Sequence, residues 1–326
     1  MFSVTNNRGF VPQSEQFEDR EMVGEDIQAY KVIEKGDFAY NPARINVGSI
    51  ARYEGGEKCM ISSLYVCFKV IESIDRDWFM HLLKTPKMNF YYNLNGEGGV
   101  RVYLFYPNFA RIRSSYPSLA EQKKIAAILS LIDERIATQS KIIEEQETLL
   151  KSLADNLISS QVANVALNDC VMAKASTMKE SELEPSGAFP VFGASGLCGY
   201  SNEALEVSDS ILVTKDGSGV GTCQYATGNH SFLGTLCSLT ACEGVYLPYI
   251  YYALLNFNFA AHKTGLAIPH IYFKDYGKAT IFCPSYDEQV RIAFGLERLE
   301  AKINTDRELL KQFHLQKGYL LSQMFI

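Results

Sequence analysis

The sequence predicts an α/β (α+β) protein in which two small mixed α/β domains are separated by two long antiparallel helices, related by a pseudo-two-fold axis. Three observations indicate this class: a repeat offset by 167 residues, a heptad pattern that continues each copy, and short strand-like segments between the copies. The predicted order is a first domain over 1–117, a spacer helix over 118–162, a second domain over 163–284 and a second spacer helix over 285–326.

The repeated segment marks the start of each long helix. It occurs as Pro117–Ala126 and again as Pro284–Ala293. In each copy a Ser stands three residues before a Glu, namely Ser118 with Glu121 and Ser285 with Glu288. This spacing is typical of a capping box, and the preceding prolines sharpen the helix boundary because proline resists helix.

A heptad seam follows each start. Apolar residues recur alternately every four and three positions, as at Ile125, Leu129, Ile132 and Ile136 in the first copy and Ile292, Leu296, Leu299 and Ile303 in the second. A period of 3.5 indicates left-handed packing against another helix. The alternative is an amphipathic helix on a globular core. However, a helix of about forty residues would be roughly 60 Å long, too long for one small domain to cover.

The chain order predicts that the two helices pair antiparallel, since the first leads to the second domain and the second leads back. Equivalent seams then predict three layers in the pair: Leu129 with Leu320, Ile136 with Phe313 and Leu153 with Leu296. Two polar residues, Gln139 and Asp306, interrupt the seams near the middle. Polar residues at such positions can fix the register or contact a partner, and otherwise they weaken the pair.

The segments between the helices read as strands and turns with one or two helices each. Examples are strands at Ser210–Thr214 and Lys278–Phe282 and helices at Asp77–Leu83 and Tyr246–Leu255. The sequences of the two domains also resemble each other faintly. Gly9 aligns with Gly196, Val47–Ser49 with Val220–Thr222 and Gly98 with Gly265. Residues 167–188 have no counterpart before Met1, so we expect the chain to begin partway into its first domain.

Composition sets broad limits. At 326 residues with 47% hydrophobic and 21% charged residues, the chain can bury two cores. It has no run of eighteen apolar residues, and its start lacks the features of a signal peptide, which predicts a cytoplasmic protein. The eight cysteines include no Cys-x-x-Cys pair and no histidine at ligand-like spacing, so we expect free thiols and no metal site.

Taken together, these motifs give a chain that resembles the specificity (S) subunit of type I restriction-modification systems. The resemblance rests on the Glu-Gln-x-x-Ile-Ala helix openings, the run Gly36–Ala51, the loop Lys215–Gly221 and the end from Leu320. It implies a non-catalytic DNA reader with two target recognition domains, each reading half of a split double-stranded site at a spacing set by the helices. It also implies docking of two methyltransferase (M) subunits, which methylate adenine, and of restriction-translocation (R) subunits, which cleave.

Nine loop residues are candidates for DNA contact, because Arg, Lys, Asn, Ser, Thr and His can read base edges. They are Arg44, Asn46, Ser49 and Arg101 in the first domain and Lys215, Ser218, Thr222, Lys263 and His270 in the second. Each lies in a loop that the two domains share in outline. For any one of them, the alternative is an exposed polar residue or a turn-former.

Charge gives no support to DNA binding by the chain alone. Residues 161–284 contain six Lys and no Arg against ten Asp and Glu. Because neutralisation of phosphates drives DNA affinity, we hypothesise that the lone subunit binds weakly and that the methyltransferase partners supply much of the backbone contact.

Enzymatic interpretations are weaker. Tyr40–Ala43 lacks the second proline and the aromatic residue of an amino-methyltransferase motif, and the glycines from Gly217 to Gly221 run into a strand instead of a helix, so no cofactor is expected. We interpret Asp209, Asp216 and Lys215 as surface turn charges, and the alternative is a nuclease centre. The main alternative to a DNA-reading subunit is an assembly scaffold that holds methyltransferase subunits together but whose recognition of a DNA sequence is lost or partial.

Overall fold

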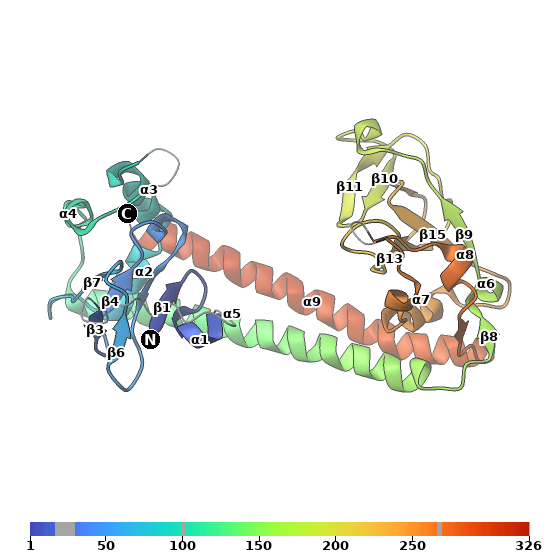
Figure 1. The fold of residues 1–326 in the computed structure, drawn as a ribbon, viewed down its shortest axis with the longest axis horizontal. Coiled ribbons are helices and arrows are strands. Elements are labelled where there is room, and N and C mark those ends of the chain that lie inside the picture. Colours follow the sequence, from blue (N-terminus) through green and yellow to red (C-terminus); the bar gives the residue numbers. More distant parts are fainter. Residues whose placement is uncertain (17–29, 99–101, 266–268, 326) are drawn as a thin grey trace. The chain divides into compact units, whose positions relative to one another are not determined.

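The computed structural model describes residues 1–16, 30–98, 102–265 and 269–325 (Figure 1). These residues form two compact units: unit 1 is Met1–Gln139 with Leu309–Ile326, and unit 2 is Ser140–Glu308. Each unit contains a β-rich domain and one end of two long helices, α5 (Leu119–Ala154) and α9 (Tyr286–Met324). The predicted mixed class with two long helices is therefore confirmed.

Unit 1 contains two small sheets. The strand orders are β2-β1-β6-β3 and β5-β4-β7. The strands are β1 (Phe2–Thr5), β2 (Gly9–Pro12), β3 (Lys31–Ile33), β4 (Phe38–Tyr40), β5 (Ile50–Arg52), β6 (Cys59–Ile61) and β7 (Val66–Phe68). Its shorter helices are α1 (Gln13–Gln16), α2 (Arg76–Leu83), α3 (Pro86–Asn95) and α4 (Tyr106–Phe109). The main core gathers around Tyr40, Trp78 and Tyr92, and Leu129 of α5 packs into it.

Unit 2 repeats this plan with more strands. The sheets are β11-β10-β14, β13-β12-β15-β9 and β16-β8. The strands are β8 (Val165–Ala166), β9 (Val171–Ala175), β10 (Phe189–Gly193), β11 (Gly196–Ser201), β12 (Ser210–Thr214), β13 (Cys223–Ala226), β14 (Ser231–Phe232), β15 (Leu236–Ala241) and β16 (Thr280–Ile281). The short helices are α6 (Leu167–Cys170), α7 (Leu247–Leu255) and α8 (Phe273–Tyr276), and a π-helical turn, Asp155–Ser159, follows α5.

The two domains share strand topology. In each, one strand of a hairpin pairs parallel with a third strand, in β2-β1-β6 and in β11-β10-β14. A central strand also lies between two antiparallel neighbours, in β5-β4-β7 and in β13-β12-β15. The glycines that the sequence aligned, Gly9 with Gly196 and Gly48 with Gly221, all have positive φ. Because this conformation favours glycine, the faint sequence similarity reflects a shared backbone.

The long helices begin where the capping pattern predicts. At the first start, the Ser118 N–H donates to the Glu121 carboxylate (3.0 Å) and the Glu121 N–H donates to the Ser118 hydroxyl (3.4 Å). At the second start, Glu288 instead pairs with Arg291 (2.9 Å), and its backbone N–H donates to the Ser285 carbonyl (3.0 Å). The first capping box is therefore confirmed, whereas the second helix begins with a different carboxylate partner.

A buried glutamine follows the repeated Glu in each copy and fastens the helix to its domain. In unit 1, Gln122 accepts a hydrogen bond from the N–H of Asp75 (2.7 Å), the N-cap residue of α2, and donates to the Pro117 carbonyl (2.9 Å). In unit 2, Gln289 accepts from the N–H of Tyr246 (2.8 Å), the N-cap residue of α7. Both side chains are almost fully buried. The repeated segment thus starts each long helix and also attaches it to the neighbouring domain.

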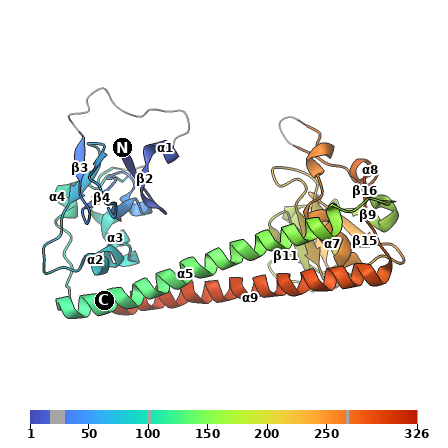
Figure 2. The ribbon, with the colours of Figure 1, turned by 90° about the horizontal axis from the view of Figure 1, so that it is seen from below.

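In unit 1 the two helices run antiparallel. Near the start of α5, Leu129 lies in the same apolar cluster as Leu320 of α9, and one turn further along α5 Asp133 bonds to Lys317. The residue numbers therefore rise along α5 while they fall along α9. Figures 1 and 2 both show the two ribbons side by side in this unit.

Unit 2 shows the same direction of pairing. Gln146 of α5 donates to the buried carboxylate of Asp306 of α9 (3.0 Å). Five residues later in α5, the Lys151 carbonyl accepts a hydrogen bond from the side chain of Asn256, the C-cap residue of α7 (2.8 Å). Six residues earlier in α9, Glu300 accepts a hydrogen bond from the hydroxyl of Tyr252 in α7 (2.7 Å). Since one short helix contacts both positions, α5 and α9 run antiparallel here too.

Two further properties complete the description. None of the described helices is long and apolar enough to cross a membrane. The eight cysteines are free thiols, and in the described part of the chain no cluster of His, Cys, Asp and Glu is arranged to hold a metal ion.

Candidate nucleic-acid interface

Two loops of unit 2 bring the predicted DNA-contacting residues together. The first loop connects β12 to β13, and the second precedes α8. The Ile271 N–H donates to the Lys215 carbonyl (2.9 Å), and the Gly217 N–H donates to the Pro269 carbonyl (3.1 Å). Because these bonds join main-chain atoms, they fix the loops whatever side chains the loops carry.

Unit 1 holds its equivalent loops in the same way. The Leu104 N–H donates to the Pro42 carbonyl (3.0 Å), at the position that Ile271 and Lys215 occupy in unit 2. A two-way backbone bridge also closes each second loop, between Glu97 and Tyr103 in unit 1 and between Thr264 and His270 in unit 2, with all four bonds at 2.8 Å. The paired loops are therefore built twice in one chain, exactly 167 residues apart at the bridge.

The five candidates of unit 2 lie on these two loops. Ser218, Thr222 and Lys263 are exposed and Lys215 and His270 are half-buried. The Thr222 hydroxyl bonds within its own loop, to the Gly219 carbonyl (2.9 Å). Their side chains include both hydrogen-bond donors and acceptors, which is the chemistry that reading base edges requires.

The candidates of unit 1 are less uniform. Arg44 is exposed, and Asn46 is half-buried and donates to the Asn93 side chain (3.0 Å). Ser49 is buried, and its hydroxyl donates to the Val4 carbonyl (2.8 Å). The structure therefore gives Ser49 a role inside the domain, and we leave it out of the proposed reading surface. Arg101 lies outside the described residues.

Two features of the loops were not anticipated from sequence. Asp216, in the first loop of unit 2, lies 2.6 Å from Nδ1 of His270 in the second loop, so a side-chain bond crosses between the loops. In unit 1, Tyr103 and Phe105 are exposed and stack with their ring centroids 6.2 Å apart. The 167-residue offset could have located the stack, because it places Tyr103 on His270 and Phe105 on Tyr272, which is also exposed.

The residues predicted to pair the helices lie on the inner faces or at their margins. Leu129 and Leu296 are buried, and Leu320 packs against the cluster that contains Leu129. Ile136, Leu153 and Phe313 are half-buried. The three individual layers remain predictions.

A family model described as the type I restriction modification DNA specificity domain matches residues 160–312. This match covers α9 as far as residue 312 and the whole β-rich domain of unit 2, including both of its loops. The match covers just under half of the chain, and it identifies residues 160–312 as a specificity domain of this type.

Solved structures from type I restriction-modification systems have the same fold. The chain is similar to the S subunit of a type I restriction-modification system from M. genitalium, with a TM-score of 0.65, 17% identity and coverage of 90% of this chain and 84% of that one. It is also similar to a chain from a structure that describes complex assembly and conformational transition of the type I R-M system, with a TM-score of 0.59, 16% identity and coverage of 90% and 83%. At these identities the likeness establishes the fold.

Sequence similarity to a curated relative is more limited. The type I restriction enzyme EcoprrI specificity subunit of Escherichia coli is 22% identical over 126 residues, which is 39% of this chain. The match spans 31% of that relative's length.

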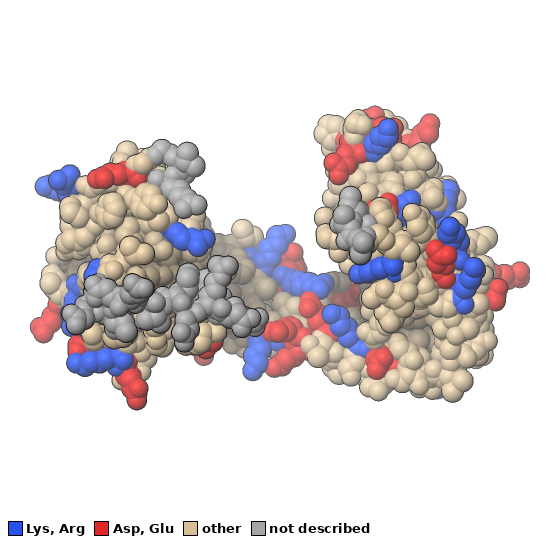
Figure 3. All heavy atoms as spheres, viewed as in Figure 1, with Lys and Arg blue, Asp and Glu red and all other residues tan. Residues whose placement is uncertain are grey.

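The surface charge of this chain is mixed. On the face drawn in Figure 3, Lys and Arg side chains of each unit lie among Asp and Glu side chains. Over the whole chain, 31 Lys and Arg stand against 37 Asp and Glu. The chain as a whole therefore has no surplus of positive charge of the kind that attracts phosphate groups.

Proposed function

We propose that the chain is the non-catalytic DNA-reading subunit of a type I restriction-modification complex, and that each unit reads one half of a bipartite double-stranded target. Residues 1–117 and 163–284 are the two recognition domains in this proposal, and 118–162 and 285–326 are the spacer helices. The observation that carries it is the loop pair built twice on equivalent backbones with different side chains. Shared scaffolds with different loops suit two readers of unrelated half-sites.

The reading surface of unit 2 consists of Lys215, Ser218, Thr222, Lys263 and His270. That of unit 1 consists of Arg44 and Asn46, together with Arg101, which stays a prediction from the sequence. Each base contact of this kind discriminates by about 1–3 kcal/mol, so the loss of one contact relaxes one position of the target by about tenfold or more.

A methylation experiment tests the assignment of half-sites. The subunit is expressed with its methyltransferase, and methylated motifs are read by sequencing of the genomic DNA. His270→Ala should relax bases in one half of the motif, and Arg44→Ala should relax bases in the other. Lys278→Ala, an exposed Lys outside the loops, is the matched control and should leave the motif unchanged. The proposal fails if both loop variants preserve the motif.

The partners follow from the same proposal. Two methyltransferase subunits dock on the subunit, restriction-translocation subunits join for cleavage, and the complex acts in the cytoplasm where its DNA target is. Large apolar side chains stay exposed on the helices, namely Ile128, Leu131 and Leu149 on α5 and Phe294, Leu315 and Tyr319 on α9. Such residues suit a helix-binding partner.

Docking is tested by charge substitution on these faces. Leu131→Glu and Phe294→Glu should each weaken capture of the methyltransferase in size-exclusion chromatography, since each places a charge in an apolar contact. Lys123→Ala, on an exposed position of α5, is the control. Unchanged capture by both glutamate variants would move the docking surface elsewhere.

A second function, an assembly scaffold without sequence reading, is favoured by one observation. Residues 161–284 contain no Arg and an excess of acidic residues. A scaffold would form the methyltransferase complex but leave no methylated motif. We expect the lone subunit to bind DNA weakly at physiological salt, and tight specific binding in a salt titration would contradict this expectation.

A further inference from the structure

Asp216 and His270 stand directly opposite each other where the two loops of unit 2 meet. They form an antiparallel bridge, and the backbone hydrogen bonds on either side of the pair are 2.9 and 3.1 Å long. Opposite residues in such a bridge carry their side chains on the same face. The backbone pairing therefore places the carboxylate beside the imidazole, with Oδ1 of Asp216 2.6 Å from Nδ1 of His270.

The backbone of His270 is fixed as well. Its N–H donates to the Thr264 carbonyl and its carbonyl accepts from the Thr264 N–H, both at 2.8 Å. The Thr264 hydroxyl also donates to the His270 carbonyl (3.3 Å). Both backbone groups and Nδ1 are thus bonded, and Nε2 is the polar atom of His270 that has no hydrogen-bond partner in the described part of the chain. Because the side chain is partly exposed, a ligand can reach this ring.

The bond to Asp216 decides what Nε2 can do. An ionised carboxylate accepts hydrogen bonds and cannot donate them, so the hydrogen in this bond is on Nδ1 of His270. A neutral imidazole carries one ring hydrogen. When Nδ1 holds that hydrogen, Nε2 keeps its lone pair and is an acceptor only.

An acceptor at this position selects among the groups that DNA presents. Phosphate oxygens are acceptors themselves and cannot bond to it. The amino groups N6 of adenine and N4 of cytosine are donors in the major groove, and each base pair presents one of them there. Nε2 of His270 is therefore suited to a base edge and unsuited to the phosphate backbone.

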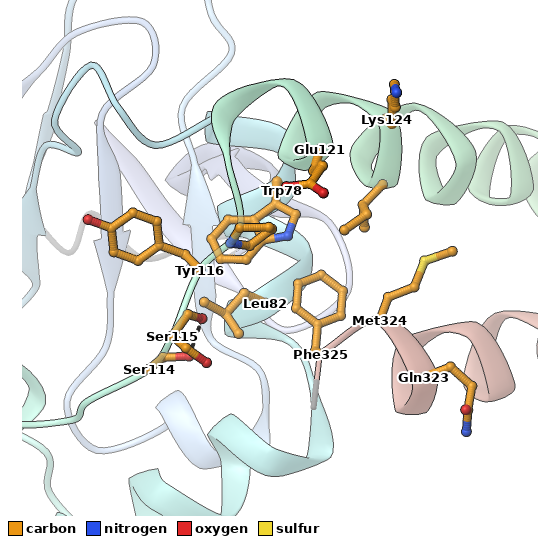
Figure 4. Close-up of a pocket in the computed structure, with 12 residues that line it drawn as sticks. Trp78, Leu82, Ser114, Ser115, Tyr116, Glu121, Lys124, Gln323, Met324 and Phe325 are labelled. Atoms are coloured by element: carbon orange, nitrogen blue, oxygen red, sulfur yellow. Dashed lines mark hydrogen bonds between the residues drawn. The ribbon is translucent and has the colours of Figure 1, made fainter.

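Unit 1 builds the same loop contact without a carboxylate. At the equivalent bridge positions it has Ala43 and Tyr103. Both line a cavity of about 590 Å³, so there is open space beside Ala43 where unit 2 has the carboxylate of Asp216. Figure 4 shows a different cavity of unit 1, of about 550 Å³, which Trp78 and Leu82 line and which shares no lining residue with the first. The carboxylate thus accompanies the ring that has two tautomers and is absent beside the phenol, which has none.

Stability does not explain the pair either. The side chains of His270 and Asp216 are 36% and 31% exposed, and ion pairs or hydrogen bonds at such positions contribute little to folding. Main-chain bonds already join the two loops, and they need no particular side chain. The carboxylate is therefore better explained by its effect on the ring than by its hold on the loops.

We propose that Asp216 is a positioning residue for DNA reading by unit 2. It holds His270 in the tautomer with the hydrogen on Nδ1, and Nε2 then accepts a hydrogen bond from the amino group of an adenine or a cytosine. This inference rests on the proposed reading function of the loops, and it names the group that His270 contacts as a base edge instead of a phosphate.

The tautomer is measured on the full chain without DNA, so this result does not depend on the reading proposal. With isotope-labelled histidine at about pH 8, where an ordinary histidine is neutral, nitrogen–proton correlation spectra show which ring nitrogen holds the hydrogen. The His270 signal is the one lost in His270→Asn. We expect the Nδ1–H form in the wild type and a shift toward the Nε2–H form in Asp216→Ala. An Nε2–H form, or hydrogens on both nitrogens, in the wild type would overturn the proposal.

The reading role is measured on the methylated motif, with the methyltransferase present. His270→Asn keeps a polar group near the place of Nδ1 and none at Nε2, so one position of the motif should relax by about tenfold. His270→Gln places an amide near Nε2 and should keep more of the selectivity. Asp216→Ala should relax the same position and should have no further effect when combined with His270→Asn. Asp169→Ala removes an exposed carboxylate outside the loops and is the control.

Two outcomes of this comparison would overturn the proposal. A purely structural role of Asp216 would give the same effect of Asp216→Ala with either residue at position 270. A phosphate contact of His270 would lower methylation at all sites together instead of relaxing one position.

The base pair that relaxes is then tested in synthetic duplexes that lack its amino group, with purine in place of adenine or 2-pyrimidinone in place of cytosine. The change should slow methylation by the wild-type complex about tenfold and methylation by the His270→Asn complex less than about twofold. An equal loss in both complexes would refute the amino contact. If His270 variants keep the motif while Ser218→Ala or Thr222→Ala relaxes it, this inference fails and the reading proposal stands. If no loop variant alters the motif, both fail.

Discussion

Removal of the buried glutamine in one unit should destabilise that unit alone. Gln122 makes three hydrogen bonds, from the Asp75 N–H (2.7 Å) and to the carbonyls of Ser73 (3.2 Å) and Pro117 (2.9 Å). Gln122→Ala leaves these three main-chain groups without their partner. At about 1 kcal/mol for each bond, the free energy of unfolding of unit 1 should fall by about 3 kcal/mol.

The chain has its own reporter for this change. Its single Trp, Trp78, lies three residues after Asp75 in α2 and is buried in the core of unit 1. Tryptophan fluorescence during urea unfolding therefore follows unit 1. With a denaturant dependence of roughly 2 kcal/mol per molar, the midpoint should fall by about 1.5 M.

The repeat supplies the matched control. Gln289→Ala removes the equivalent side chain from unit 2, which contains no Trp, so it should leave the fluorescence midpoint unchanged while lowering the transition seen by far-UV circular dichroism. Lys123→Ala changes an exposed neighbour of Gln122 and should change neither signal. A Gln122→Ala midpoint within about 0.3 M of wild type, or an equal shift in Gln289→Ala, would refute the reasoning.

Three further outcomes follow from individual side chains. Burial holds the pKa of His81 below its usual 6.5, so the folded state favours the neutral ring. The contribution of His81 to the stability of unit 1 is therefore full above pH 6.5 and should be lost as the pH falls through the folded pKa. His81→Gln should flatten this pH dependence of the urea midpoint that Trp fluorescence reports. Ser49→Ala should cost unit 1 about 1 kcal/mol through the lost bond to Val4, without altering the methylated motif, and an altered motif would return Ser49 to the reading surface. Gly221→Ala should destabilise unit 2 by about 2 kcal/mol or more, as measured by circular dichroism during unfolding. The reason is that Gly221 has a φ of +92° and that the new Cβ would lie 2.7 Å from the Cβ of Phe259. Unchanged stability would contradict this backbone conformation and this close approach.

Features with a periodic or local signal could be predicted from the sequence. The helix starts after Ser118 and Ser285, strand β12 and helices α2 and α7 all lie where the patterns predicted them. The strand predicted at Lys278–Phe282 is shorter, because only Thr280 and Ile281 pair with β8. Local propensity determines such elements, whereas pairing length depends on the partner strand.

Features that depend on distant contacts could not be predicted. Gln122 lies seven residues before Leu129, so the heptad pattern places it on the inner face of α5, but the pattern gives no sign that it binds the backbone of Asp75 at the start of α2. The bond between Asp216 and His270 joins residues 54 positions apart, and the burial of Ser49 depends on β1, 45 residues earlier. No spacing rule links such residues, since tertiary packing alone brings them together.

The main-chain bonds between the loops are consistent with the proposal that one scaffold serves two different readers. In both units the second loop is closed by a backbone bridge, and its far end donates a backbone N–H to the first loop. None of these bonds requires a particular side chain, so Tyr103 in one unit and His270 in the other occupy the same position with different chemistry. The buried glutamine likewise holds main-chain groups at the base of each domain. Exchange of the loop side chains should therefore change the DNA sequence that is read at little cost in stability. Loop-exchanged chains that keep the unfolding midpoints of both units but give a new methylated motif would establish that folding and DNA reading are separable.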